Sequence, residues 1–272
     1  TCRRSDNHVR REETRTVIDP RAIIDPSAKI ADNVSIGPWS IIGPNVEIGE
    51  GTTIASHVVI KSNTRLGKGN QVYQFASVGE DPADKKFAGE DTWLEVGDNN
   101  IIREGCTLHR GTGAGGSYTR IGSNNLLMAY VHVAHDCIVG NNTVFANNAG
   151  LSGHAEVDDW AILGGFAGVN QFLRIGAHAM VGGMTHISHD VPAYVIVSGS
   201  PAAVRSVNTV GLERRGFDAA TVKLIRDAFK TVYKRGLSLE EARESLTPVA
   251  ETNPALAVFL KSITGSTKGI HR

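Results

Sequence analysis

The stretch 131–151, VHVAHDCIVGNNTVFANNAGL, decides the fold, because a large apolar side chain recurs in it at every sixth residue. Val133, Val139, Phe145 and Leu151 occupy these positions. The series extends in both directions, and the positions two residues earlier are mostly small. A glycine often follows the large residue. A period of six matches neither an amphipathic helix nor the alternation of a half-buried strand.

This period is typical of a parallel β-helix built from hexapeptides, so the predicted fold class is mainly β. Each hexapeptide forms a short strand and a corner, and three of them close one triangular coil. The large residues point into the coil, and the small ones fit near the corners. Stacked strands lie about 4.8 Å apart, so residues one coil apart lie above one another. We expect glycine to supply the backbone freedom that a corner needs.

The repeat covers residues 17–195, with two interruptions. It begins near Ile24, breaks at 79–92, resumes at Val96 and breaks again at 110–118. Both breaks are polar or glycine-rich and are predicted to be loops extruded from the coil. Extruded loops on solenoids tend to gather on the binding face, so both are candidates for shaping a site.

The region 196–272 is predicted to be a connecting loop followed by a small α-helical domain. The pattern becomes helical after the Pro- and Gly-containing segment 190–207. Asp218 is a plausible N-cap for a helix that ends near Lys234. Ser238 and Glu241 form a capping box for a second helix, and Asn253 precedes a third. Such a domain would cover one end or edge of the solenoid.

Residues 1–16 are predicted to be a disordered leader or a targeting remnant. They contain five arginines and begin with Thr rather than Met. Organelle transit peptides are rich in arginine but poor in acidic residues. Asp6, Glu12 and Glu13 argue against that reading. The compartment therefore stays open between an organelle, such as the mitochondrion, and the bacterial cytoplasm.

The composition excludes several classes of function. A formal net charge of zero gives no argument for nucleic-acid binding. No apolar run has the length of a transmembrane segment. Cys2, Cys106 and Cys137 do not suggest a disulfide framework, and a reducing compartment is expected. No CxxC pair indicates zinc.

Histidines are the main candidates for chemistry. In the register of the repeat, His109, His135, Gly153 with its neighbour His154, and Gln171 stack into a polar column on one face. None of them is on the apolar series, so they should point outward to solvent or to a neighbouring subunit. The alternative is a solvated face with incidental histidines. A zinc site at His132 and His135 is a weaker alternative, because a third ligand is missing.

A histidine in this column can act as a general base in acyl transfer. His135 would take the proton of a hydroxyl group as its oxygen attacks a thioester. Asp136 would orient the ring and stabilise its charged form, if a corner lets the carboxylate reach it. The backbone N–H of Gly153 would donate to the oxyanion of the tetrahedral intermediate.

Two pairs of basic residues suit phosphate or an acidic protein partner. They are Lys85 with Lys86, and Arg214 with Arg215. Ordinary surface charge is the alternative for each of them.

Several segments together resemble the UDP-N-acetylglucosamine 3-O-acyltransferase family, whose members catalyse the first step of lipid A synthesis. These are QFASVGE (74–80), TLHRGT (107–112), NNLLMAYVHVAHDCIVGNN (124–142), GHAEVDDWAILGG (153–165) and RRGF (214–217). The resemblance runs from about residue 17 to 272. It implies a homotrimer of left-handed β-helices with active sites between the subunits.

The resemblance also implies the reaction and its partners. A 3-hydroxyacyl chain would pass from acyl carrier protein to the 3-hydroxyl of UDP-N-acetylglucosamine, with no metal and no cofactor. His135, Asp136 and Gly153 would be catalytic. The implied substrate-binding residues are Asp84, Lys86, His109, His132, His154, Gln171, Asn208, Arg214 and Arg215. Gly183 and Met184 fall where the family measures acyl-chain length.

Two departures from the family pattern affect fine substrate contacts. Asn170 stands where bacterial members have histidine, and Val210 where some have an acid. Three further readings stay open. One is a related hexapeptide acyltransferase that uses another sugar nucleotide or an amino acceptor. The others are a non-catalytic solenoid scaffold and a zinc hydratase of the same fold.

Overall fold

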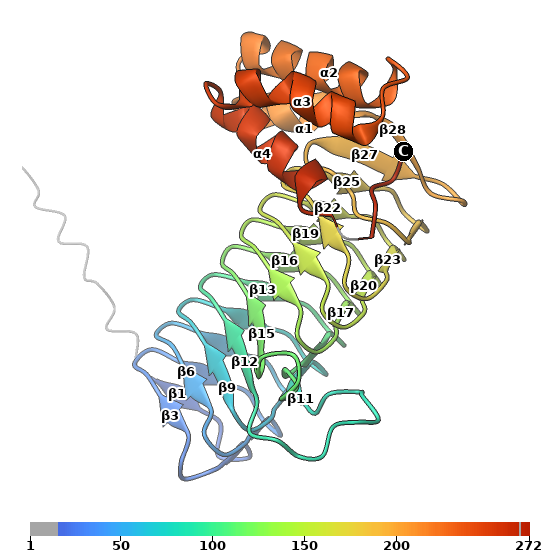
Figure 1. Cartoon of the computed structure of the whole chain (residues 1–272). Coiled ribbons are helices and arrows are strands. Elements are labelled where there is room, and N and C mark those ends of the chain that lie inside the picture. The colour runs from blue at the N-terminus through green and yellow to red at the C-terminus, as the bar shows by residue number, and fades with distance from the viewer. Residues whose placement is uncertain (1–15, 267) are drawn as a thin grey trace, which may run out of the picture.

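The computed structural model describes residues 16–266 and 268–272, and shows a long triangular solenoid with helices at one end (Figure 1). Residues 1–15, with nearly all of the predicted leader, lie outside the described part. The solenoid is a left-handed parallel β-helix, as predicted. Apart from one antiparallel strand near the C-terminus, the short strands of the described residues form three parallel sheets, which are the three faces of the prism.

On each face, successive strands lie three elements apart in the chain, except for the last two strands of the first face. The first face contains β1 (Val17–Ile18), β4 (Ser35–Ile36), β7 (Thr53–Ile54), β10 (Gln71–Val72), β13 (Ile101–Ile102), β16 (Leu126–Leu127), β19 (Val144–Phe145), β22 (Ile162–Leu163), β25 (Met180–Val181), β27 (Val195–Ser198) and β28 (Ala203–Val207). The second face contains β2 (Ile23–Ile24), β5 (Ile41–Ile42), β8 (Val59–Ile60), β11 (Ser77–Glu80), β14 (Thr107–His109), β17 (His132–Val133), β20 (Gly150–Leu151), β23 (Gly168–Val169) and β26 (His186–Ile187). The third face contains β3 (Lys29–Ile30), β6 (Glu47–Ile48), β9 (Thr64–Leu66), β12 (Trp93–Val96), β15 (Tyr118–Ile121), β18 (Ile138–Val139), β21 (Glu156–Val157) and β24 (Arg174–Ile175).

The register between coils is the one that the repeat predicts. His132 pairs with Gly150 and Val133 with Leu151, one coil further on. The large residue of each hexapeptide is buried inside the coil, and Leu151 is only 1% exposed. Alanines two positions earlier, such as Ala149, are also buried. This continuous apolar column is the core of the molecule.

The predicted role of glycine at the corners is wrong for the glycines that follow the large residues. The left-handed corner position lies three residues after the large one and holds mostly other residues, such as Asp136 and His154. The glycines instead permit close stacking. A Cβ on Gly164 would lie 2.5 Å from the Gly183 nitrogen. The coil spacing, not the backbone dihedral, therefore requires glycine there.

Two loops leave the solenoid between the second and third faces. The first connects β11 to β12 and spans residues 81–92, since Gly79 and Glu80 continue the strand. The second connects β14 to β15 and spans residues 110–117. The Arg110 guanidinium joins the two, because it pairs with Asp81 and donates to Ser62 Oγ at 3.0 Å. Both extrusions therefore start beside the same buried cation.

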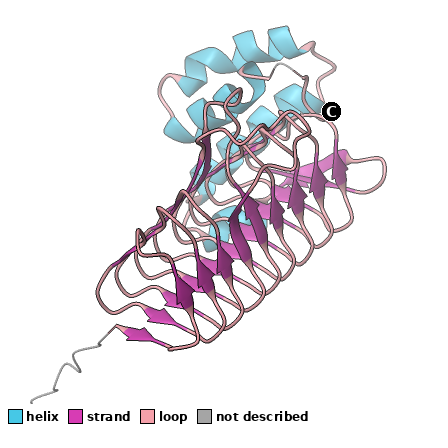
Figure 2. Cartoon of the chain, turned by 90° about the horizontal axis from the view of Figure 1, so that it is seen from below, coloured by secondary structure: helices cyan, strands magenta, loops and turns pink. Residues whose placement is uncertain are grey.

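Four helices follow the solenoid: α1 (Thr209–Arg214), α2 (Ala219–Tyr233), α3 (Leu239–Ala250) and α4 (Pro254–Thr264). The three predicted helices are present. Asp218 caps α2, Asn253 caps α4, and both halves of the Ser238–Glu241 capping box form. The helices lie at the C-terminal end of the solenoid (Figure 1 and Figure 2). No helix in the described ranges has both the length and the hydropathy needed to cross a bilayer.

Besides α1, two features of the C-terminal region were not predicted. The segment read as a crossing loop contains β27 and β28, which form an antiparallel pair. The end of the chain also returns to the solenoid, where the Asp190 N–H donates to the Gly269 carbonyl at 3.0 Å. These contacts fix the helices and the tail against the last coils.

Candidate active site

His135 and Asp136 form a hydrogen-bonded pair at the corner between the second and third faces. His135 Nδ1 lies 2.7 Å from Asp136 Oδ2. Because a carboxylate only accepts, Nδ1 must carry the proton in this pair, and Nε2 is then the basic nitrogen of the neutral ring. The imidazole is 15% exposed and the carboxylate 1%. The His135 ring is therefore accessible to solvent, whereas the Asp136 carboxylate that orients it is buried.

The corner itself allows two neighbouring side chains to meet. On a flat strand, adjacent residues point to opposite faces. Asp136 has a φ of 60°, which is the left-handed corner conformation. Thr119 stabilises this turn, because its Oγ1 accepts the Asp136 N–H at 2.7 Å. The left-handed corner thus turns the carboxylate back onto the His135 ring.

The Asp136 carboxylate accepts two further hydrogen bonds from Thr112. The Thr112 N–H donates to Oδ1 at 2.8 Å, and the Thr112 hydroxyl donates to Oδ2 at 2.7 Å. These donors compensate for the water that burial removes from the carboxylate.

Gly153 lies one coil beyond His135, directly against its ring. A Cβ built on Gly153 would come within 2.6 Å of His135 Cε1 and 2.8 Å of Nε2. Among the described residues, no backbone hydrogen bond uses the Gly153 N–H. An amide without a backbone partner thus lies close to the basic ring nitrogen of His135, which is a suitable arrangement for an oxyanion donor.

His154 belongs to the same cluster. Its ring meets the His135 ring edge-on, with centroids 5.3 Å apart, and stacks on Phe172 at 4.4 Å. His154 Nε2 is 3.6 Å from Asp136 Oδ2. It is therefore a second imidazole within reach of the same carboxylate.

His109 and His132 form a second pair on the second face. Their ring centroids are 5.0 Å apart, and His132 Nδ1 lies 2.7 Å from Thr107 Oγ1. Burial, with a smaller contribution from His132, lowers the pKa of His109 to about 4. Burial and the neighbouring His135 also lower the pKa of His132. Both imidazoles are therefore held neutral at pH 7.

Gln171 lies one coil beyond Gly153, and its side chain is exposed. It lines a hollow of about 420 Å³ together with Ser152, Asn170, Leu173, Ser188 and Lys268. Asn170 Oδ1 is 2.7 Å from His186 Nε2, so a histidine does lie next to this position. A polar hollow thus opens at the end of the column.

The structure does not bring all the predicted site residues together in one chain. Asn208 and Arg215 lie at the corner between the third and first faces. Asn208 caps α1 and donates to the His178 carbonyl at 3.0 Å. Arg215 Nη1 is 3.2 Å from His178 Nδ1. Arg214 is exposed beside it. Burial and the Arg215 charge lower the pKa of His178 to about 4.

The remaining predicted residues are in two other places. Asp84 and Lys86 form a turn in the loop 81–92, where the Lys86 N–H donates to Asp84 Oδ1 at 3.0 Å. Gly183 and Met184 lie at the corner between the first and second faces, and the Met184 side chain is 80% exposed. In a single chain, the predicted residues are therefore distributed over all three corners.

One cluster has the composition of a metal site. Ligand atoms of His135, Asp136 and His154 lie within 4.8 Å of one another. This set contains His135 but not His132, so it differs from the pair that the sequence suggested for zinc. However, Asp136 Oδ2 already accepts from both His135 and Thr112. A metal would have to displace these donors.

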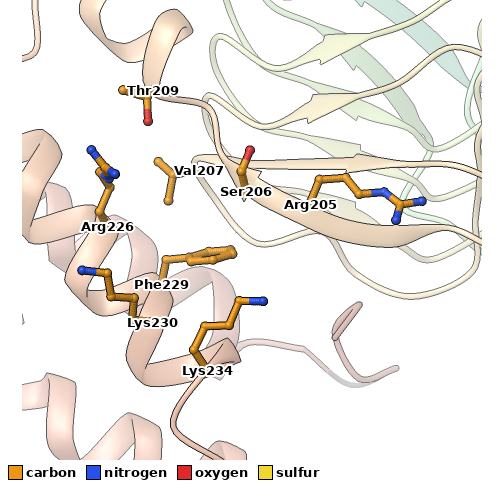
Figure 3. Close-up of a pocket in the computed structure, with 8 residues that line it drawn as sticks. All are labelled: Arg205, Ser206, Val207, Thr209, Arg226, Phe229, Lys230 and Lys234. Atoms are coloured by element: carbon orange, nitrogen blue, oxygen red, sulfur yellow. The ribbon is translucent and has the colours of Figure 1, made fainter.

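Another hollow, of about 460 Å³, lies between β28 and α2 (Figure 3). Phe229 and Val207 form its apolar floor, and the surrounding side chains include Arg226, Lys230 and Lys234. It contains no residue that the sequence predicts to act in catalysis.

Sequence reasoning missed the contributions of Thr112, Thr107 and His178. The TLHRGT segment contains two of these residues, but its contacts depend on how the extruded loop folds back. His178 occupies an ordinary corner position of the repeat, so its spacing does not distinguish it. Its hydrogen-bond partner is apparent only from the way α1 docks on the solenoid.

Comparisons with known proteins match both the repeat region and the C-terminal region of the chain. The family described as UDP N-acetylglucosamine O-acyltransferase, domain 2, matches residues 190–271. The bacterial transferase hexapeptide repeats match residues 27–62 and 118–153.

Relatives cover almost the whole chain. An acyl-[acyl-carrier-protein]–UDP-N-acetylglucosamine O-acyltransferase from Ectopseudomonas mendocina is 59% identical over 94% of this chain and 99% of its own. The protein of that name from Pseudomonas savastanoi is 57% identical over 94% of this chain and 100% of its own. Both organisms are bacteria, and they lend no support to the mitochondrial interpretation of residues 1–16.

Solved structures with the same fold are also known. LpxA from Acinetobacter baumannii has a TM-score of 0.92 and 47% identity, and the match covers 94% of this chain and 100% of that one. The Arabidopsis UDP-N-acetylglucosamine acyltransferase has a TM-score of 0.83 and 34% identity, with coverage of 94% and 100%.

Proposed function

The chain belongs to the UDP-N-acetylglucosamine O-acyltransferase family, and we propose that it carries out the first step of lipid A synthesis. In this reaction a 3-hydroxyacyl chain passes from acyl carrier protein to the 3-hydroxyl of UDP-N-acetylglucosamine. The chain is an acyltransferase by family, at 59% identity to an enzyme of that name. The observation that carries the mechanism is the His135–Asp136 pair stacked against Gly153.

The transfer begins with His135 as general base. Its Nε2 accepts the proton of the sugar 3-hydroxyl while the oxygen attacks the thioester carbonyl carbon. Asp136 accepts the Nδ1 proton, which fixes the tautomer and stabilises the imidazolium that forms. The Gly153 N–H donates to the oxyanion of the tetrahedral intermediate. When the carbon–sulfur bond breaks, the imidazolium returns the proton to the thiolate of the carrier.

The surrounding groups suit a polar, phosphate-bearing acceptor. His109 and His132, both held neutral by burial, can donate and accept hydrogen bonds beside the base without adding charge. Gln171 lies on the far side of Gly153, next to the polar hollow. Asp84 and Lys86 would reach the acceptor from the loop 81–92, and His154 would contact the substrate next to the base.

We propose that the active unit is a homotrimer with its sites between subunits. In one chain, the base at one corner is separated from Arg214, Arg215 and Asn208 at another corner. Neighbouring copies would bring the two corners together, so that the basic pair of one subunit faces the base of another. The exposed corner of Met184 would then face the same seam, where Gly183 and Met184 limit the length of the acyl chain.

The bacterial relatives favour the bacterial cytoplasm over an organelle as the site of this reaction. The decisive experiment is an acyl-transfer assay with UDP-N-acetylglucosamine and a panel of 3-hydroxyacyl carrier proteins. Transfer to the sugar 3-hydroxyl with one preferred chain length is the expected result.

Two other outcomes of the assay would point elsewhere. Transfer only to an amino-sugar nucleotide or to another hexose nucleotide would identify the related acyltransferase. The lack of both transfer and binding of either substrate would leave a scaffold. The assay compares acceptors because Asn170 and Val210 depart from the family pattern near the site.

A further inference from the structure

The extruded segment 110–117 lies directly on the carboxylate that orients the base. Thr112 contributes two donors to it, the backbone N–H to Oδ1 and the hydroxyl to Oδ2, at 2.8 and 2.7 Å. Each donor holds a different oxygen of the carboxylate. Thr112 therefore fixes the plane of the Asp136 carboxylate as well as its position.

The Thr112 hydroxyl shares its acceptor with the base. Asp136 Oδ2 accepts both the Thr112 hydroxyl and the His135 Nδ1 proton, at 2.7 Å each. The Thr112 oxygen in turn accepts the Gly115 N–H at 3.1 Å. Because that lone pair is occupied, the hydroxyl proton is directed at Asp136. A chain of hydrogen bonds therefore runs from the loop backbone to the imidazole.

Gly115 shows how closely the segment covers the carboxylate. A Cβ built on Gly115 would lie 2.1 Å from Asp136 Cγ and 2.2 Å from Oδ1. Carbon atoms in proteins do not approach that closely. A Cβ on Gly113, two residues earlier, would have Glu90 Cγ as its nearest neighbour, at 3.4 Å. Only the later glycine is required by the contact with Asp136.

We propose that Thr112 is a positioning residue for the acyl transfer and that Gly115 allows the segment 110–117 to seal Asp136. This inference rests on the proposed function, in which His135 is the base. Thr112 touches neither substrate nor the reacting atoms. It acts through Asp136, by keeping Oδ2 on His135 Nδ1.

The structure also indicates what fails without the hydroxyl. His154 Nε2 is only 3.6 Å from Asp136 Oδ2. A carboxylate released from the Thr112 hydroxyl can rotate toward His154 and weaken its bond to His135. The base would then lose its orientation while the fold stays intact, and misplacement of about 1 Å can cost about 100-fold in rate.

The first test is Thr112→Val, which keeps the size of the side chain and the backbone donor but removes the hydroxyl. We expect kcat to fall about 10- to 100-fold with KM within about threefold. Thr112→Ser should restore most of the rate, because it keeps the hydroxyl. Thr143→Val is the matched control, since Thr143 is also buried and its hydroxyl donates to Asn125 at 2.7 Å, away from the site. It should lower the melting temperature as much as Thr112→Val without lowering kcat.

A double variant separates positioning from a general structural role. If Thr112 acts through Asp136, Thr112→Val should lower kcat little further in a protein that already carries Asp136→Asn. Losses in rate that multiply in the double variant would overturn the proposal. So would a wild-type rate for Thr112→Val. If Thr112→Val does not fold, Gly115→Ala against Gly113→Ala gives the same contrast, with only the first expected to lose activity.

A third readout does not depend on substrate. The proton NMR signal of the His135 Nδ1–H, identified by its loss in His135→Gln, should shift or broaden in Thr112→Val and remain in Thr143→Val. An unchanged signal would contradict the positioning role even if no acyl transfer were detected. An altered signal with no transfer by the wild type would instead contradict the proposed function.

Discussion

The imidazole of His135 rests against the α-carbon of Gly153, so close that a methyl group there would come within 2.6 Å of the ring. One coil of the solenoid separates the two residues in sequence, and the register of the strands brings them together. Position 153 therefore requires glycine because a side chain there would collide with the His135 ring, not because of its backbone conformation. The base and the proposed oxyanion donor are held at a distance that the fold itself sets.

Gly153→Ala should lower kcat/KM by about 100-fold, because the new methyl group pushes the ring away from its working position. Steady-state kinetics with a 3-hydroxyacyl carrier protein measures the effect. Gly265→Ala is a suitable control, because its Cβ would meet its nearest atom, the Lys261 carbonyl oxygen, at 3.5 Å. Equal rates in the two variants would mean that His135 does not depend on this contact.

Mixing two inactive variants should restore activity if the site spans two subunits. His135→Ala and Arg215→Ala would each lose transfer when pure. In randomly mixed trimers, about a quarter of the seams would combine an intact base with an intact arginine. Co-refolded or co-expressed protein should therefore recover up to about a quarter of the wild-type rate. Recovery of no activity, in mixed trimers confirmed by mass spectrometry, would place both residues in the same subunit's site.

Stability should fall on acidification because two half-buried histidines have a lowered pKa. The folded chain holds His109 and His178 neutral down to a pKa of about 4, against an ordinary value of 6.5. Between these values the unfolded chain binds more protons, so the free energy of unfolding decreases as the pH falls. The stabilisation is fully present above pH 6.5.

Melting temperatures from pH 7.5 to 4.5 measure this effect. The decrease in melting temperature with falling pH should be smaller in His109→Gln, by at most the contribution of one proton. A pH dependence identical to that of the wild type would show that His109 is not one of the groups responsible.

Removal of metal should leave the activity unchanged. Although His135, Asp136 and His154 have ligand atoms within 4.8 Å, the carboxylate is already occupied by two donors. Dialysis against a chelator, followed by metal analysis and an assay, tests this expectation. Loss of transfer that zinc restores would revive the zinc alternative.

The period of six made much of this structure predictable. Since each coil takes three hexapeptides, the column of His135, Gly153 and Gln171 follows from counting alone. The helices followed from their caps, because Asp218 and Asn253 satisfy backbone donors that only a helix start leaves free. Helix caps and a fixed repeat are local patterns, so they can be recognised in a single sequence.

The rest depended on contacts that no period specifies. Thr112 holds Asp136 only because the 110–117 loop folds back over the corner. The length of this loop does not specify which of its residues reaches the carboxylate. The partnership of Arg215 with His178 depends on how α1 docks on the last coils. The sequence left the Asp136–His135 bond open, since adjacent residues meet only when the corner adopts the left-handed conformation.

The most direct test of the mechanism is the rate of acyl transfer by His135→Ala. The variant should keep the melting temperature and oligomeric state of the wild type, because the ring is outside the apolar core. Its kcat/KM should fall by about 10³-fold or more, as expected when a general base is lost. A folded variant with a nearly unchanged rate would contradict the mechanism and remove His135 from the chemistry.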